Sequence, residues 1–187
     1  YVQVAGDGNH NTVQCYESGT SSPTAKITPI NPTITLYKAS SGTDTFSNGA
    51  SRGAISYGSN IKSYPMANVS GKWKASSSDS TKVSVSPTSD TATSANARRE
   101  ITATGAGYTT SAITVTLTFT PSDTTNYNTV TRTYTHTVSK VDATCPSLTA
   151  YSAAYDGSAH GIGVSGGSGG TVQYRTATSG DGSTWST

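Results

Sequence analysis

Within residues 111–139, apolar residues alternate with threonines in the first arm and share one face in the second, and this pattern is the clearest structural signal in the chain. Pro121, Asp123 and Asn126 interrupt it midway, where turn residues are expected. A repeat of two residues places the apolar side chains on one face of an extended strand. The pattern therefore predicts a β-hairpin with one buried face. Its apolar positions are Ile113, Val115, Leu117, Phe119, Val130, Tyr134 and Val138.

The first residues of the chain repeat this hairpin pattern. The segments YVQV and TVQCYE flank the polar turn GDGNHN within residues 1–17, which predicts a strand, a turn and a returning strand. The turn motif of this copy, Asn9 and Asn11, matches Asn126 and Asn128 at an offset of 117 residues. We therefore interpret the first segment as a second copy of the same closing hairpin.

A further internal similarity relates residues 27–33, ITPINPT, to residues 138–144, VSKVDAT, at an offset of 111. The two offsets, 117 and 111, differ by six, which indicates an insertion around residues 18–23 in the first copy. Similarity of this kind within one chain is typical of an array of related modules.

Residues 31–140 contain the parts of one complete module. Strands are predicted at 32–37, at both ends of 71–87 and at 99–109. The segment 71–87 carries a tryptophan, a Ser/Asp-rich turn and an alternating valine strand, namely Trp73, Ser76 to Asp79, Val83 and Val85. In this it resembles the bacterial immunoglobulin-like group 2 domains, which implies a β-sandwich. A tryptophan at such a place fills a core more often than it binds a ligand. The predicted core aromatics are Trp73, Tyr134 and Phe119.

Residues 141–187 begin another module and do not complete it. They offer an initial strand, the sequence AYDGSAHGIGV, a Gly/Ser loop and a final hairpin. The tripeptide YDG at 155–157 resembles the MBG-type immunoglobulin-like repeats of bacterial surface proteins, whose closing hairpin typically carries a Gly-Asp-x-Asn-Tyr-Asn turn. That turn stands at the other end of this chain, at residues 6–11, with His10 in place of the tyrosine.

These observations predict an all-β chain of tandem immunoglobulin-like sandwiches, with one module split between the two ends. Residues 1–30 supply its closing strands, residues 31–140 form the complete domain, and residues 141–187 supply its opening strands. A sheet that lacks its last strands leaves backbone groups unpaired and a core half exposed. The chain enters a sandwich of this kind at one end and leaves it at the opposite end. The two halves should therefore meet between copies, in a head-to-tail contact that repeats without closing into a ring. One period cut from a long tandem polypeptide would produce the same fibre.

Composition indicates a folded extracellular protein. The 34 threonines and 30 serines favour strands and turns, while 11 tyrosines and the Val/Ile alternation distinguish the chain from a disordered stalk. A scattered net charge of +2 does not indicate nucleic-acid binding, and no apolar run of about 20 residues predicts membrane insertion. The first residue, Tyr1, suggests a processed product or a segment of a longer chain. Together with the resemblance, this composition favours a bacterial cell surface.

The two cysteines belong to the split module. Cys15 lies in the last strand of the first segment, and Cys145 lies in the first strand of the last segment. In an extracellular protein they could form a disulfide between neighbouring copies. The alternative is two buried free thiols that behave as small apolar side chains.

Candidate catalytic side chains are sparse. His10, His136 and His160 are isolated and lack the spacing of a zinc site, so we expect them to be solvated. Glu17 and Glu100 are the only glutamates, so a pair of catalytic carboxylates would depend on aspartates that already have turn-forming roles. We predict no enzymatic activity.

Two loop motifs lack essential parts of a binding site. Asp7, Asn9 and Asn11 have the spacing of the first calcium ligands, but Thr12 and Ser18 replace the required glycine and glutamate. The segment GVSGGSGG lacks the lysine and the helix of a phosphate-binding loop and is expected to connect strands. We therefore predict no cofactor and no metal.

The predicted function is an extracellular structural repeat protein that forms a fibre with copies of itself. One alternative is the stalk of a bacterial adhesin, whose modules hold a separate binding domain away from the cell. A weaker one is a carbohydrate-binding module that uses Tyr151, Tyr174 or Trp185. The surface could also carry glycans, at the sequon beginning with Asn68 or on threonines, or bind a host ligand.

Overall fold

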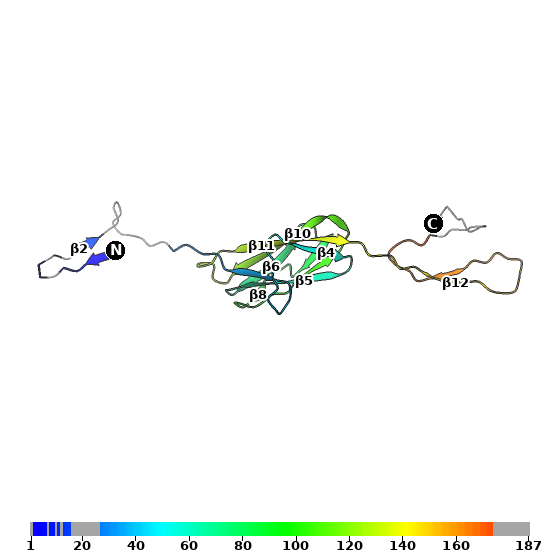
Figure 1. The fold of residues 1–187 in the computed structure, drawn as a ribbon, viewed down its shortest axis with the longest axis horizontal. Helices are drawn as coiled ribbons and strands as arrows, with labels where there is room; N and C mark the ends of the chain where they lie inside the picture. The colour runs from blue at the N-terminus through cyan, green and yellow to red at the C-terminus, as the bar shows by residue number, and fades with distance from the viewer. Residues whose placement is uncertain (1, 7, 10, 12, 16–26, 174–187) are drawn as a thin grey trace.

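The computed structural model describes residues 2–6, 8–9, 11, 13–15 and 27–173 (Figure 1). Thirteen strands make up the regular structure of these residues, and no helix occurs among them. The chain is therefore all-β, as the alternating sequence pattern predicts.

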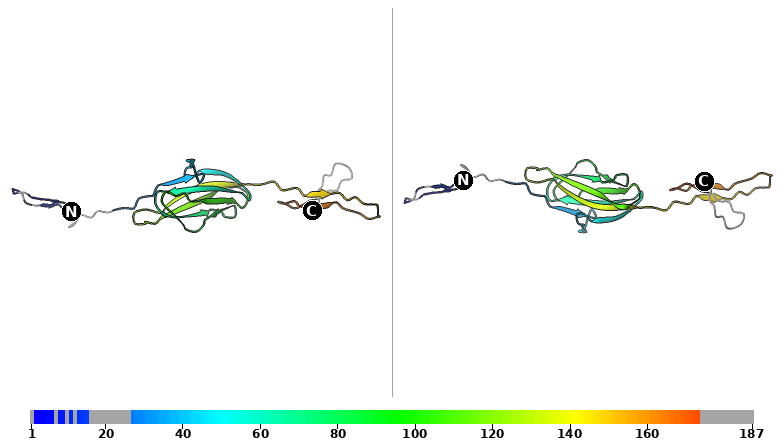
Figure 2. Two further views of the ribbon diagram at one scale, coloured as in Figure 1. Left: turned by 90° about the horizontal axis from the view of Figure 1, so that it is seen from below. Right: turned by 90° about the horizontal axis from the view of Figure 1, so that it is seen from above.

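Residues 34–139 form a two-layer β-sandwich, which we call the central sandwich (Figure 2). One sheet has the strand order β4-β11-β10-β6-β8 and the other has the order β3-β5-β9-β7. The first sheet consists of β4 (Ser51–Ser56), β6 (Gly71–Ser77), β8 (Thr91–Thr93), β10 (Thr109–Pro121) and β11 (Val130–Ser139). The second consists of β3 (Ile34–Tyr37), β5 (Asn60–Ala67), β7 (Val83–Ser86) and β9 (Ile101–Gly105).

The hairpin predicted at 111–139 is confirmed as the antiparallel pair β10–β11, in which Phe119 faces Val130. Every second residue of β10 is buried from Ile113 onward, and the threonines between them are half-buried on the outer face. The other edge of β10 pairs with β6, where Phe119 faces Trp73. The alternating stretch thus forms the middle of the larger sheet, because both of its edges find partners.

The core lies between the two sheets and contains all three predicted core aromatics. Trp73 and Phe119 are 0% exposed, with ring centroids 4.8 Å apart, and Tyr134 is 1% exposed. The Ser63 hydroxyl donates a hydrogen bond to the Tyr134 oxygen at 3.0 Å, so this buried phenol has a partner. Burial of one such large side chain stabilises the fold by about 1.5–3 kcal/mol.

Strands β4 and β5 have no counterpart among the sequence-based predictions. The buried positions of β5 are Ser63, Pro65 and Ala67, a set that gives no apolar alternation. β4 pairs with β11 in parallel, with Ile55 opposite Val138. Parallel pairing joins segments far apart in the chain, so local patterns do not reveal it.

The expectation that the isolated histidines are solvated is wrong for His136, which lies on β11 and is 1% exposed. Its Nδ1 is 2.9 Å from the carbonyl oxygen of Gly53, and a carbonyl can only accept, so Nδ1 carries the hydrogen. The other ring nitrogen is buried without a hydrogen-bond partner. Burial lowers the pKa of His136, and the nearby Arg52 guanidinium acts in the same direction, against the opposing effect of the Gly53 hydrogen bond.

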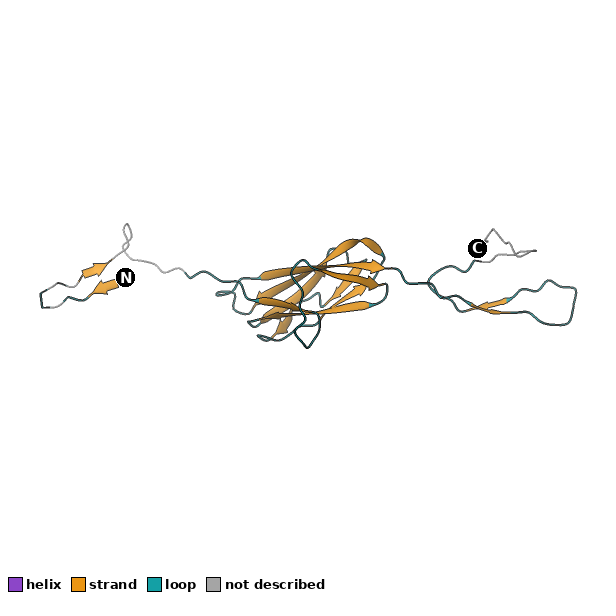
Figure 3. Cartoon of the chain, viewed as in Figure 1, coloured by secondary structure: helices purple, strands orange, loops and turns teal. Residues whose placement is uncertain are grey.

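Two short strand pairs lie at opposite ends of the central sandwich (Figure 3). The head pair is β1 (Val2–Val4) with β2 (Val13–Cys15), and it confirms the hairpin predicted at the start of the chain. The tail pair is β12 (Ser147–Thr149) with β13 (Gly163–Ser165), also antiparallel. β13 is formed by the first residues of the segment GVSGGSGG, which was expected only to connect strands.

Candidate functional site

The head pair and the tail pair are the candidate functional site, because their strand edges are open. Each is a sheet of two strands, and neither pairs with any other described strand. In the central sandwich, by contrast, the hairpin β10–β11 has β6 along one edge and β4 along the other. Open edges present rows of unpaired N–H and C=O groups that can accept a further strand.

The head pair keeps the geometry of the central hairpin. Val4 faces Val13 as Phe119 faces Val130, with a head turn two residues shorter: eight residues separate the first two and ten separate the second. Side chains alternate between the faces of a strand, so a change by an even number keeps each residue on its face. The head pair is therefore an antiparallel hairpin with facing residues like those of β10–β11, and no other described strand pairs with it.

The described residues of the tail form no core. From residue 140 to residue 173 not one residue is buried. Large apolar side chains stand in solvent there, including Leu148 on β12 at 66% exposure and Ile162 just before β13 at 55%. Exposed apolar positions on strands whose edges are open indicate an interaction surface.

Hydrogen bonds join the linker before β3 to the closing turn of the central sandwich. The Asn128 backbone N–H donates to the Ile30 carbonyl at 2.9 Å, and the Ile30 N–H donates to the Asn126 carbonyl at 3.0 Å. The Asn128 side-chain Nδ2 donates to the Pro29 carbonyl at 3.2 Å and to Asn31 Oδ1 at 3.1 Å. We call this arrangement the linker clasp. It gives the sequence-predicted turn motif a function in positioning the linker.

A turn at Asn48 and Gly49 holds β11 in the central sandwich. Thr133 N–H donates to Asn48 Oδ1 at 2.7 Å, and Gly49 N–H donates to the Thr133 carbonyl at 2.8 Å. Gly49 has a φ of 79°, in the left-handed region that favours glycine. This turn was absent from the sequence-based predictions.

The tail contains a similar residue pair, Asp156 and Gly157. Gly157 has a φ of 78°, and nine residues after each turn stands a positive-φ glycine, Gly58 or Gly166, with a φ of 79° or 74°. The central segment has a further one, Gly53, between Gly49 and Gly58. The shared glycine spacing was the signal available in the sequence. In the tail no described strand occupies the place that β11 takes in the central sandwich.

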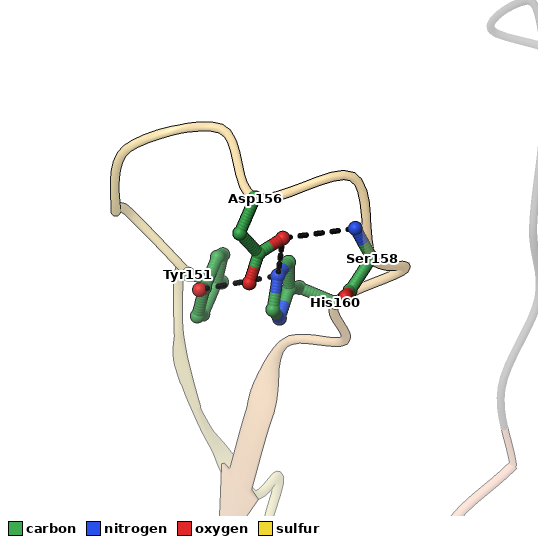
Figure 4. Close-up of polar contacts among 4 residues, drawn as sticks. All are labelled: Tyr151, Asp156, Ser158 and His160. Atoms are coloured by element: carbon green, nitrogen blue, oxygen red, sulfur yellow. Dashed lines mark hydrogen bonds and ion pairs between the residues drawn. The ribbon is translucent and has the colours of Figure 1, made fainter.

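An aromatic ring next to an arginine or histidine side chain accompanies each turn. In the central sandwich Arg52 lies over the Phe46 ring at 4.5 Å, and Phe46 meets Tyr134 of β11 edge-on at 5.6 Å. In the tail His160 stacks on Tyr151, with ring centroids 4.0 Å apart and an interplanar angle of 11° (Figure 4). The tail therefore has a similar pair without the strand that the central pair contacts.

Asp156 binds His160 and its own turn (Figure 4). Its Oδ1 lies 2.8 Å from His160 Nε2 and accepts the Ser158 N–H at 2.9 Å. The hydrogen bond from His160, followed by that from Ser158, lowers the pKa of Asp156. In a Ser-His-Asp relay the imidazole stands between serine and carboxylate. Here Ser158 lies on the carboxylate, so the cluster does not have the geometry of a catalytic triad.

Cys145 is exposed and free within the chain. It lines an open groove of about 330 Å³ between residues 143–146 and 167–173. Cys15 belongs to β2, at the other end of the molecule. The structure therefore does not bring the two cysteines of one chain together.

The remaining predicted sites occupy scattered positions. Asn68 is exposed, and its Oδ1 accepts the Thr33 N–H at 2.8 Å. Tyr151 is stacked on His160, whereas Tyr174 and Trp185, the other two candidate sugar-binding rings, lie outside the described residues. The described part of the chain contains no group of three or more metal-ligating side chains.

No described helix is long and apolar enough to cross a membrane. A comparison with known protein families finds no family model that matches the chain, and no curated protein matches it either.

Proposed function

We propose that the chain is a structural protein of the bacterial cell surface, whose copies join head to tail into a fibre by completing each other's strands. One observation carries the proposal: a strand pair with open edges lies at each end of a finished sandwich (Figure 1). The two pairs lie at opposite ends of the molecule, which supports completion between two copies rather than within one.

The physical driving force is the pairing of open strands together with the burial of apolar side chains. A two-stranded pair is marginally stable in water, and an added strand supplies both backbone hydrogen bonds and a covered face. The contact is heterologous, because the head surface differs from the tail surface. A heterologous contact that does not close into a ring propagates as a filament.

The two pairs supply different parts of one sandwich in this proposal. The head pair provides the hairpin that corresponds to β10–β11, and the tail provides the opening strands. The tail turn at Asp156 and Gly157 then receives the neighbour's strand as Asn48 and Gly49 receive β11. The completed module is immunoglobulin-like, of the MBG type. Copies can be separate chains or successive periods of one longer polypeptide, since both give the same contact.

A disulfide between Cys15 of one copy and Cys145 of the next would make the junction covalent. The exposure of Cys145 in an open groove supports this, because the thiol is accessible to a neighbouring copy. Fibres are then expected to shorten or weaken on reduction. Non-reducing electrophoresis that shows only free thiols in the assembled fibre would contradict the disulfide.

The test uses two shortened chains, one with residues 31–187 and one with residues 1–140. Each retains the central sandwich and one end, so each is expected to remain monomeric by sedimentation velocity. Mixed together they are expected to form a discrete one-to-one complex, while the full chain forms long particles visible by electron microscopy. A full chain that stays monomeric at high concentration would contradict the proposal and favour the adhesin stalk.

A further inference from the structure

The linker that follows the central sandwich, residues 140–142, corresponds to residues 29–31 at the offset of 111. Val141 stands for Ile30, and Asp142 stands for Asn31, the side-chain acceptor of the linker clasp. Val141 is 53% exposed. Within the described residues, neither the backbone of Val141 nor the carboxylate of Asp142 makes a hydrogen bond. This linker therefore has the acceptors of a clasp without the donor.

Asn11 is the counterpart of Asn128, the donor of the linker clasp, at the offset of 117. It is exposed, and neither its backbone nor its side chain makes a hydrogen bond to the described residues. Asn11 stands between β1 and β2 of the head pair, which lies beyond one end of the central sandwich, and residues 140–142 lead to β12, which lies beyond the other (Figure 1). The donor and the acceptors of this second clasp therefore lie at opposite ends of one copy.

We propose that Asn11 of one copy binds residues 140–142 of the next copy in a second linker clasp. Its backbone N–H donates to the Val141 carbonyl, and its Nδ2 donates to the Lys140 carbonyl and to an Asp142 carboxylate oxygen. Every bond has its counterpart in the clasp of Asn128. The inference rests on the proposed head-to-tail assembly. It adds a contact outside the strands that fixes the angle between successive modules.

The second clasp also aligns the two cysteines. In the central clasp, Ile30 and Tyr127 form a parallel bridge, so both chains run onward in the same direction. Cys15 follows Asn11 by four residues, and Cys145 follows Val141 by four residues. An extended chain advances about 3.3 Å per residue, so in the proposed clasp each cysteine follows the clasp by about 13 Å of chain. They reach the same level of the composite module.

Formation of that disulfide requires an oxidant, for which a small-molecule disulfide such as oxidised glutathione serves. The Cys15 thiolate attacks the small disulfide and releases one glutathione thiol. The Cys145 thiolate then attacks the mixed disulfide and releases the second, so two protein thiols become one disulfide while one glutathione disulfide becomes two thiols.

The test is a double-mutant cycle on the full chain under reducing conditions, with the end-to-end dissociation constant measured by sedimentation velocity. Asn11→Ala removes two side-chain hydrogen bonds and is expected to weaken association about tenfold. Asp142→Ala should weaken it by several-fold, and the double variant should be no weaker than Asn11→Ala. Asp142→Asn copies Asn31 of the central clasp and should keep association close to that of the unmodified chain.

Asn128→Ala is the matched control, because it makes the same change in the clasp within one chain. It should lower the unfolding free energy of the central sandwich and leave the end-to-end dissociation constant unchanged. The Asn11→Ala chain should keep the unfolding free energy of the central sandwich and raise the end-to-end dissociation constant. With oxidised glutathione it should form the inter-copy disulfide more slowly.

The possible failures are distinguishable. Assembly with an unchanged dissociation constant in Asn11→Ala, or with independent effects of the two substitutions, overturns the second clasp and leaves strand completion standing. A full chain that does not assemble overturns the second clasp and the proposed function together.

Discussion

The central sandwich and the two end pairs are built from the same sequence patterns, yet only the central sandwich has a core. β10–β11 and the head pair are both antiparallel hairpins with matching register, and Gly49 and Gly157 have nearly the same positive φ. In the central sandwich nine strands bury Trp73, Phe119 and their neighbours. Between residues 140 and 173 nothing is buried.

The difference teaches that local pattern and completed burial are separate requirements. An alternating strand forms a stable sheet only when both its edges and its apolar face find partners, because pairing and burial must offset the entropy of ordering the chain. At the ends of this molecule the pattern is present and the partners are absent from the described residues. This is the reason to look for the partners on another copy.

The largest expected effect comes from Trp73→Ala. The side chain is 0% exposed between the sheets, so its removal should lower the unfolding free energy of the central sandwich by about 3–5 kcal/mol. Chemical denaturation followed by tyrosine fluorescence measures this. The matched change in the tail, Tyr155→Ala, removes a ring that is 96% exposed and should alter the unfolding free energy by less than about 0.5 kcal/mol. Similar losses of unfolding free energy from both changes would contradict the difference in packing between the central sandwich and the tail.

A smaller effect is expected from Gly71→Ala on β6. A Cβ atom there would stand 2.5 Å from the Phe119 ring and 2.5 Å from the Thr120 carbonyl oxygen, so the neighbours must shift. The expected loss is about 1–3 kcal/mol of unfolding free energy. Gly161→Ala in the tail is the control, since a Cβ atom at Gly161 would meet nothing within 4 Å. A thermal melt of Gly71→Ala that matches the unmodified chain would show that the neighbouring strands β6 and β10 are not close-packed at this point.

The smallest expected effect is the pH dependence that comes from His136. Its pKa is lowered in the folded sandwich, so below about pH 6.5 the unfolded chain binds a proton that the folded chain does not. The contribution of neutral His136 to the unfolding free energy is therefore complete above that pH. As the pH drops toward the folded pKa, the unfolding free energy falls by at most about 1.4 kcal/mol per pH unit. His136→Gln keeps a donor for the Gly53 carbonyl and should flatten the dependence.

Denaturation midpoints at a series of pH values from about 7 to about 5 measure this effect. Arg52 and Tyr134 stand next to His136 and do not change charge in that window. The carboxylates Asp79, Glu100 and Asp123 have pKa values below their usual range, so they titrate at lower pH. If the denaturation midpoint of His136→Gln changes with pH as steeply as that of the unmodified chain, other groups cause the pH dependence.

The sequence by itself determined the all-β class, the two antiparallel hairpins and the burial of alternate residues. The reason is that successive side chains of a strand point to opposite faces, so every second residue belongs to the buried face, as do Ile113, Val115 and Leu117. It also revealed the internal copies, because turn residues such as Asn11 and Asn128 keep their identity where the backbone requires them.

Tertiary structure alone decided the parallel pairing of β4 with β11, the burial of His136 and the contact between Ile30 and the closing turn. Each of these joins residues far apart in the chain, and no local periodicity encodes which distant segment will lie alongside. The same holds for the turn at Asp156 and Gly157: its residues are ordinary turn formers in the sequence. Their similarity to a strand-holding turn became visible only when Asn48 and Gly49 were found against β11.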